Sequence, residues 1–135
     1  MNRKKLFISG VVLLIFIFLA LVKFAIFDRG FDITIRNNTD ITVSGLKITY
    51  EKITKDIEVP SLSSHKKLKI NVLPTENFSE NSMKIYYIDN QGNKQEECIV
   101  GYFEKGYRGK VTVDINSVDK NGKLYFKVIS SSNFI

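Results

Sequence analysis

An uninterrupted apolar run near the N-terminus constrains this chain more than any other feature. From Leu6 to Val22 no residue is charged, and every residue except one Ser, one Gly and one Ala is Leu, Ile, Val or Phe. The run continues to Phe27 with a single interruption, Lys23. A helix over residues 6–27 would be about 33 Å long, close to the hydrocarbon thickness of a bilayer. We therefore expect one transmembrane helix over residues 6–27.

A cleaved signal peptide is the alternative explanation of this run, with the basic residues before it as the n-region. The run is longer than the roughly 7 to 15 apolar residues of a signal-peptide h-region. The flank from Leu21 to Phe27 holds mostly bulky side chains, so it offers no small-x-small cleavage site, and it contains no cysteine for lipidation. These features favour an uncleaved anchor over a secreted domain.

The charges that flank the run predict its orientation. Basic residues precede it, whereas one acidic and one basic residue cancel after it: Arg3, Lys4, Lys5, Asp28, Arg29. Because basic flanks are retained in the cytoplasm, residues 1–5 should be a cytoplasmic tail and the rest of the chain should lie outside. Lys23 sits near the outer end of the run, where its ammonium group can reach the lipid headgroups.

The net charge of +6 does not indicate a nucleic-acid binder. Four of the 20 basic residues flank or interrupt the apolar run, which leaves 16 against all 14 acidic residues, or +2. A near-neutral domain lacks the basic surface that binds phosphate backbones. We therefore expect no nucleic-acid partner.

Residues 31–130 repeatedly alternate apolar and polar side chains, which predicts half-buried β-strands. We expect such strands at residues 31–36, 46–51, 67–72, 110–115 and 124–129, and a short one around residues 57–59 that ends at Pro60. Two further runs, residues 83–88 and 97–103, are apolar on both faces and are typical of central strands. Turn-forming sequences at residues 37–40, 90–93 and 119–122 predict hairpins. No helix is expected after Phe27.

Seven or eight short strands predict an antiparallel β-sandwich. An Ig-like Greek key is the preferred form, and a small barrel is the alternative. The expected organisation is a linker at residues 28–30, the sandwich at residues 31–130 and a tail at residues 131–135.

Part of this pattern carries a family resemblance. Its residues are Ile35, Asn37, Asn38, Leu46, Ile48, Tyr50, Val59, Pro60, Ser61, Leu62, Leu68 and Ile70. They resemble the opening half of membrane-anchored Ig-like β-sandwich proteins of Gram-positive bacteria, and the abundance of Lys, Ile and Asn is similar to that of AT-rich genomes. The resemblance implies an Ig-like fold at the outer face of a bacterial cell membrane. The Trp and the paired cysteines of immunoglobulin domains are missing.

No pattern of catalytic or metal-binding residues stands out. His65, the only histidine, has no Cys, Asp or Glu within six residues, so we expect a surface loop residue. Cys98, the only cysteine, is expected to be a small buried hydrophobe rather than a reactive thiol. The loops at residues 89–93 and 119–122 echo calcium loops but lack the closing Glu, which favours hairpin turns. The sequence thus predicts a protein that is not an enzyme and has no cofactor or metal.

The least ordinary stretch lies between residues 101 and 109. Three glycines there bracket two tyrosines and an arginine, between two strong strands. Tyr and Arg are favoured at contact surfaces because they bury a large area with few rotatable bonds and still form hydrogen bonds. We expect a hairpin that contacts a partner, with candidate contact residues Tyr102, Lys105, Tyr107 and Arg108. The alternative is a glycine turn whose aromatic residues pack across strands.

The predicted function is that of a non-enzymatic, single-pass membrane protein that presents a small extracytoplasmic β-sandwich to a protein partner. It could be an accessory part of an envelope or secretion assembly, or an immunity protein that intercepts an exported toxin. A hydrolase or a ligand-binding sensor is the alternative from another class. Catalysis would require groups that the pattern does not reveal. A sensor would need more cytoplasmic machinery than the five residues before Leu6 provide.

Overall fold

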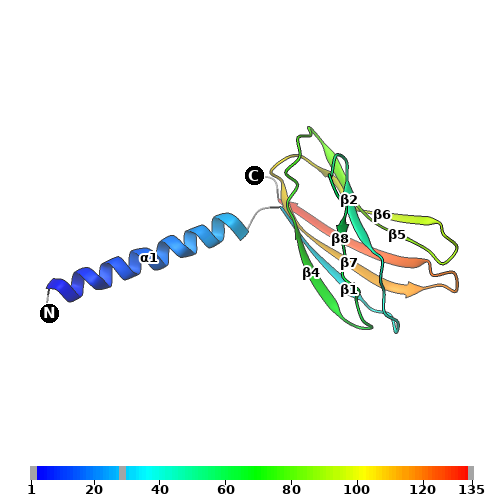
Figure 1. Ribbon diagram of the computed structural model, residues 1–135, viewed down its shortest axis with the longest axis horizontal. Coiled ribbons are helices and arrows are strands. Elements are labelled where there is room, and N and C mark those ends of the chain that lie inside the picture. The colour runs from blue at the N-terminus through cyan, green and yellow to red at the C-terminus, as the bar shows by residue number, and fades with distance from the viewer. Residues whose placement is uncertain (1–2, 28–29, 134–135) are drawn as a thin grey trace.

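The computed structural model describes residues 3–27 and 30–133, as one helix followed by eight strands (Figure 1). The helix α1 spans Arg3–Phe27, and its described side chains from Ile8 to Leu21 are all exposed. Within the residues that the structure describes, no helix is both long enough and apolar enough to cross a membrane. The side chains of the four expected topology residues, Arg3, Lys4, Lys5 and Lys23, and the expected linker residues 28–29 lie outside the described residues.

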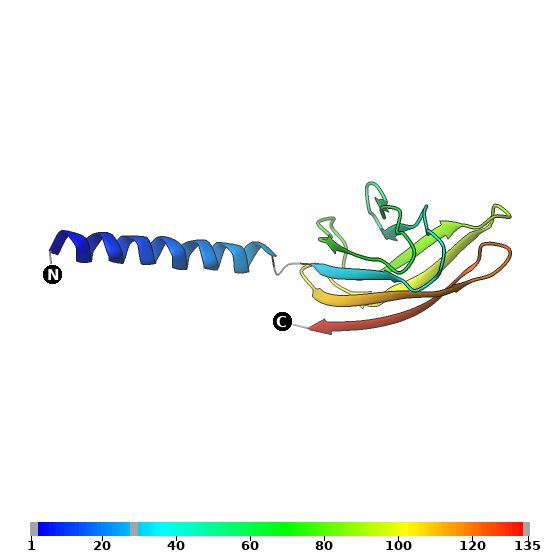
Figure 2. The same cartoon turned by 90° about the horizontal axis from the view of Figure 1, so that it is seen from below.

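The eight strands form two four-stranded sheets that stack as a β-sandwich (Figure 2). The first sheet has the order β4-β1-β7-β8, with β1 at Phe31–Asn37, β4 at Lys67–Val72, β7 at Arg108–Val118 and β8 at Leu124–Asn133. The second sheet has the order β3-β2-β5-β6, with β2 at Lys47–Tyr50, β3 at Ile57–Glu58, β5 at Asn81–Ile88 and β6 at Lys94–Phe103. Each strand lies in a segment where the sequence predicts one, so the β-sandwich is confirmed. β8 extends to Asn133, beyond the predicted domain end at residue 130.

The core lies between the sheets, where the apolar residue of each alternating pair points inward. Ile33 and Ile35 of β1 are fully buried, and so is Ile85 of β5 in the opposite sheet. At one end the ring of Phe103 contacts Phe31 and Phe78 edge-on, with centroids 5.1 and 5.4 Å apart. Such edge-to-face pairs add about 0.5–1.5 kcal/mol beyond the buried area. The aromatic cluster therefore joins the start of β1 to the end of β6.

The first sheet is mixed, which corrects the prediction of a purely antiparallel sandwich. β1 pairs antiparallel with β4 but parallel with β7, in a register that runs from Phe31 opposite Gly109 to Asn37 opposite Ile115. Parallel neighbours need a long connection, and here five strands lie between β1 and β7 in the chain. Alternation of side chains reports only which face is buried, so it could not reveal this direction.

Two of the three hairpins that the turn-forming sequences predict are present. The turn at residues 90–93 joins β5 to β6 and the turn at residues 119–122 joins β7 to β8. In each, an aspartate accepts backbone N–H bonds: Asp89 Oδ1 from Gln91 and Asn93, both at 2.9 Å, and Asp119 Oδ1 from Asn121 and Lys123, at 2.8 and 2.9 Å. Their carboxylates therefore serve the turns. The turn at residues 37–40 is not a hairpin, because it leads from β1 in the first sheet to β2 in the second.

β6 is an edge strand, so the prediction that it lies centrally is wrong, whereas β5 does lie inside its sheet. The β5–β6 register shifts between Met83 opposite Val100 and Lys84 opposite Cys98, which inserts Ile99 as an extra residue. Both Ile99 and Val100 are buried, and Cys98 is exposed instead of buried. A β-bulge of this kind shifts the alternation of side chains, which explains why the sequence pattern misplaced the cysteine.

The two ends of the sandwich differ in their connections. At the helix end the chain enters through Gly30, whose carbonyl accepts a bond from Gly109 N at 3.1 Å, and β8 ends beside Arg108. The loop between β6 and β7 lies at this end (Figure 1). At the opposite end, the hairpin end, the two hairpins touch through a bond from Asn90 N to Asn121 O at 3.1 Å.

Candidate interaction surface

The predicted contact stretch at residues 101–109 is a crossover between the sheets rather than a hairpin. β6 ends at Phe103 in the second sheet and β7 begins at Arg108 in the first. The turn between them is closed by a bond from Tyr107 N to Glu104 O at 3.1 Å, and Gly106 takes a φ of +88°, which glycine adopts without steric cost. The buried Phe103 ring holds the crossover to the core, so the turn projects from the helix end.

The two tyrosines of the crossover contact each other and share one carboxylate. Their ring centroids are 6.2 Å apart at an interplanar angle of 72°. The Tyr102 hydroxyl donates to the Glu104 carboxylate, and this bond raises the pKa of Tyr102 to about 12. Desolvation, followed by the charge of Glu104, raises the pKa of Tyr107. Both phenols therefore stay protonated and can donate at neutral pH.

The four predicted contact residues differ in exposure. Tyr102 is 48% exposed and Lys105 is exposed, whereas Tyr107 is half-buried and packs against the core. Arg108 is half-buried at the first position of β7, opposite Asn133. The structure thus brings the four residues together along one turn. Packing against the core accounts for Tyr107, as the alternative interpretation expects, but not for Tyr102.

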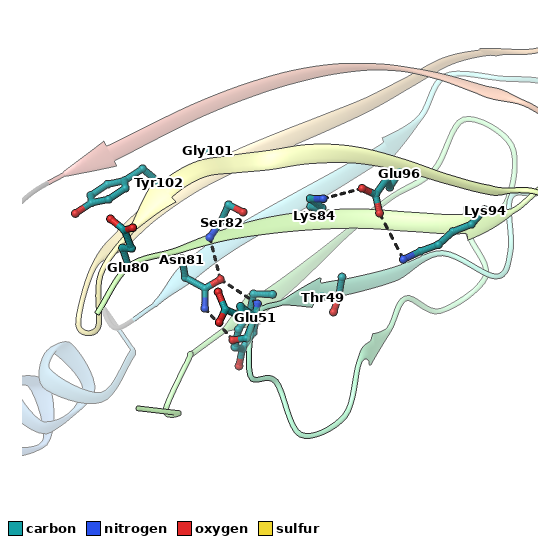
Figure 3. Close-up of a pocket in the computed structure, with 11 residues that line it drawn as sticks. Thr49, Glu51, Glu80, Asn81, Ser82, Lys84, Lys94, Glu96, Gly101 and Tyr102 are labelled. Atoms are coloured by element: carbon teal, nitrogen blue, oxygen red, sulfur yellow. Dashed lines mark hydrogen bonds and ion pairs between the residues drawn. The ribbon is translucent and has the colours of Figure 1, made fainter. Parts of the chain in front are cut away.

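Tyr102 also closes one end of a groove of about 610 Å³ on the outer face of the second sheet (Figure 3). The lining residues come from β2, β5, β6 and the segments beside them: Thr49, Tyr50, Glu51, Glu80, Asn81, Ser82, Lys84, Lys94, Glu96, Gly101 and Tyr102. Only Gly101 and Tyr102 belong to the predicted stretch. The other positions are scattered between Thr49 and Glu96, and only strand pairing brings them together.

Asn81 fixes the shape of the groove floor. Its Oδ1 accepts from Glu51 N at 2.9 Å and its Nδ2 donates to Glu51 O at 2.9 Å, so one buried amide pairs with the backbone at the end of β2. Ser82 N donates to the same Oδ1 at 2.9 Å. Because both polar atoms of the Asn81 side chain form hydrogen bonds, this amide holds the junction of β2 and β5 together.

The two ends of the groove have different charges (Figure 3). At the end next to the β5–β6 hairpin, Glu96 forms ion pairs with Lys84 at 2.6 Å and with Lys94 at 3.4 Å. Lys84 lowers the pKa of Glu96, and Glu96 in turn raises the pKa of Lys84. At the helix end the lining carboxylate Glu80 lies beside Tyr102, and Glu51 lies farther along the groove beside Asn81. A ligand in the groove would therefore meet ammonium groups at one end and carboxylates with a phenol at the other.

The remaining candidate residues lie away from the groove or add no chemistry to it. His65 is exposed, as predicted, and its Nε2 lies 2.8 Å from Asp40 Oδ1 in the loops of the hairpin end. Among residues 3–27 and 30–133 the structure brings together no group of three or more His, Cys, Asp or Glu side chains that could hold a metal ion.

No protein-family model matches this chain, and no curated protein matches it. The NMR structure of a protein from Eubacterium rectale matches with 17% sequence identity and a TM-score of 0.44, over 75% of this chain and 88% of that chain. At this distance the likeness assigns neither a family nor a function.

Proposed function

We propose that this protein is anchored in a bacterial cell membrane by its N-terminal helix, in a single pass with the N-terminus in the cytoplasm. The β-sandwich, taken as Ig-like, then lies outside the membrane and binds another protein without catalysing a reaction. The observation that carries the proposal is the surface of α1. From Val11 to Leu19 nine consecutive large apolar residues are all exposed. A helix that is apolar on every side needs an apolar environment, which a bilayer supplies.

The sequence also supports the length of the proposed membrane span and its orientation. The proposed span, residues 6–27, extends on both sides beyond the part of the helix whose side chains are described, residues 8–22. Over residues 6–27 the apolar side chains outweigh the cost of one lysine near the outer boundary. Arg3, Lys4 and Lys5 favour a cytoplasmic N-terminus.

Cys98 offers a direct test of the topology, because it is the only cysteine of the chain and is exposed on β6. A membrane-impermeant maleimide should label Cys98 in intact cells, and the Cys98→Ser variant should stay unlabelled. As a control, Asn2→Cys in the Cys98→Ser background should react only after permeabilisation. Labelling of Cys98 only in permeabilised cells would contradict the orientation. A membrane-bound product that lacks residues 1–27, or recovery in the soluble fraction, would contradict the anchor.

We place the protein contact at the groove and the crossover. Tyr102 joins the two, since it lines the groove and contacts Tyr107. An aromatic ring with a phenol oxygen, next to fixed charges and a rigid strand, has the chemistry of a protein contact residue.

A photo-crosslinking amino acid at position 102 tests this contact in intact cells. The matched control is position 125, because Tyr125 of β8 is 49% exposed and lies on the other sheet. A discrete protein adduct should form at position 102 and be absent at position 125. Adducts at both positions, or at position 125 alone, would exclude the groove as the specific contact.

Two roles fit the proposed topology, and deletion separates them. An envelope or secretion accessory should give an envelope or export defect in pure culture. An immunity protein should give no defect until toxin-producing siblings are present.

A further inference from the structure

The outer face of the first sheet carries a local excess of positive charge, although the net charge of the whole domain is near zero. The strand registers place twelve outward positions in three rows across β4, β1, β7 and β8. The rows are Lys67, Arg36, Asp114, Lys127; then Lys69, Thr34, Thr112, Ile129; then Asn71, Asp32, Lys110, Ser131. Five are basic and two acidic, a surplus of three positive charges on one face. We call this surface the basic face.

Both carboxylates of the basic face are already used within it. Arg36 Nε lies 2.7 Å from Asp114 Oδ1, and Lys69 Nζ lies 2.8 Å from Asp32 Oδ2. Asp32 also accepts from Asn71 Nδ2 at 3.0 Å. Once these pairs are counted, the cations Lys67, Lys110 and Lys127 make up the surplus.

The surplus has a cost in the folded protein. Lys67 stands directly opposite Arg36 in the antiparallel β1–β4 ladder, and like charges at such positions are destabilising. All three lysines are exposed. The packing of the sheet does not require them, because their strands are already held by the core residues on the other face. A negatively charged ligand would offset the repulsion.

The spacing of the three lysines selects the kind of ligand. Lys67 and Lys127 lie in the same row three strands apart, about 14 Å, and Lys110 lies four residues along β7 from that row, about 13 Å. These are backbone separations, and side chains stand roughly perpendicular to a sheet. A single phosphate ion could contact two of the ammonium groups only if the lysines bent toward each other, whereas a polymer can contact them in their extended positions. Thr34 and Thr112 occupy the middle of the grid, where their hydroxyl groups can donate to an oxyanion between the lysines.

We infer that the basic face binds a linear anionic polymer with repeating phosphate groups, laid across β4, β1, β7 and β8. This inference revises the expectation from net charge alone that the domain lacks a surface for phosphate backbones. This binding site is separate from the groove, which lies on the other sheet. It therefore goes beyond the proposed protein contact and does not depend on it.

Fluorescently labelled inorganic polyphosphate provides the probe, with full-length protein in a non-ionic detergent. Binding measured by anisotropy at 50 mM salt should weaken about 20-fold at 200 mM salt, as expected for three displaced counterions on a flexible polyanion. Inorganic monophosphate at equal phosphate concentration should not compete. Absence of polyphosphate binding at 50 mM salt would overturn the inference, and so would effective competition by monophosphate.

Two triple variants that lose the same number of charges distinguish binding at the basic face from a general effect of net charge. Lys67→Gln, Lys110→Gln and Lys127→Gln together should raise the Kd at least about tenfold and flatten its salt dependence. The control combines Lys55→Gln, Lys120→Gln and Lys123→Gln, which changes the net charge equally at exposed loop positions. The control should bind as the wild type does. Equal weakening by both triples would overturn the site, and equal binding of poly-glutamate of matched length would overturn the assignment to phosphate. A melting temperature at least as high as that of the wild type shows that each triple variant is folded.

Discussion

Single polar side chains hold together the parts of this sandwich that strand pairing does not reach. Asn37, 1% exposed at the end of β1, is the clearest case. Its Nδ2 faces the carbonyl oxygens of Ile41, Leu62 and Ser63 at 2.7, 3.0 and 3.1 Å. Its Oδ1 accepts from Thr39 N at 3.0 Å and from Thr39 Oγ1 at 2.7 Å. One amide thereby ties the β1–β2 connection to the loop before β4, which explains why this turn leaves its sheet.

Replacing the Asn37 amide should destabilise the fold in a pH-dependent way. Asn37→Ala leaves several buried groups unpaired and should cost about 3 kcal/mol in the free energy of unfolding. Asn37→Asp places a carboxylate against three carbonyl oxygens, which would raise its pKa above the unfolded value. This variant should therefore regain stability as the pH falls below the folded-state pKa.

Urea denaturation between pH 4 and pH 8 measures this effect, with the exposed neighbour Asn38→Asp as control. Asn38→Asp should change the free energy of unfolding by less than about 0.5 kcal/mol. A pH-independent loss in Asn37→Asp would contradict the proposed packing of the amide.

The Tyr87 hydroxyl is a second buried polar link, and its loss should be measurable. Tyr87 is 4% exposed, and its oxygen accepts from Leu124 N at 2.6 Å, which joins β5 to the first residue of β8. Tyr87→Phe leaves that N–H unpaired and should lower the free energy of unfolding by about 1–3 kcal/mol. Tyr125→Phe, at an exposed position on β8, should be neutral in the same urea titration. Equal stability of Tyr87→Phe and wild type would exclude this bond.

At the level of strands and turns, the crossover shows that similar sequence signals can have different structural causes. Three glycines bracket the two tyrosines in the sequence, but each has a different environment. Gly106 takes a positive φ in the turn, a Cβ on Gly109 would lie 2.7 Å from Ser131 O, and a Cβ on Gly101 would meet nothing within 4 Å. Only the first two positions require glycine.

Alanine substitution separates these environments. Gly109→Ala must displace the β8 backbone or the Phe31 ring, 3.3 Å from the added methyl, and should cost about 1–3 kcal/mol. Gly101→Ala, also within a strand and at an ordinary φ, should be neutral or slightly stabilising. Thermal or urea unfolding of the two variants measures the difference. Equal stabilities would show that β7 and β8 are not packed this closely.

How far the sequence could predict the structure depends on whether a feature is local. Alternation at Phe31, Ile33 and Ile35 reports a buried face, so strand positions and the β-sandwich followed from it. The sheet that each strand joins depends on distant partners. This is why the sequence predicts hairpins at the turn after β1 and at residues 101–109, where the chain in fact crosses between the sheets. Of the residues that line the groove, the sequence points to Tyr102 as a contact residue but not to Lys84 or Glu96. Lys84 and Glu96 form their ion pair only because β5 pairs with β6.

For the molecule as a whole, the carboxylates should make stability sensitive to acid. A hydrogen bond from Lys69 lowers the pKa of Asp32, one from Tyr50 lowers that of Glu76, and backbone N–H groups, foremost that of Asn93, lower that of Asp89. A group with a depressed folded-state pKa contributes stability above its unfolded pKa and loses it as the pH falls through the folded value. The Tm should therefore be nearly constant above about pH 5 and fall below about pH 4.

The Asp89→Asn variant tests whether carboxylates with lowered pKa values cause this acid sensitivity. The amide oxygen can still accept the turn bonds but carries no charge, so the Tm difference from wild type should be largest near neutral pH and shrink on acidification. A difference that grows as the pH falls would contradict the depressed pKa of Asp89.

The position of β1 has a mechanical consequence. β1 follows directly on the segment after α1 and lies inside the first sheet, with six residues in register with β4 and seven with β7. Tension applied through the helix would run along β1 and load both ladders in shear, so that their hydrogen bonds would have to break together. A terminal hairpin under the same tension would open one bond at a time. The domain is thus attached to α1 through an inner strand of its sheet, which resists extraction better than an edge strand would.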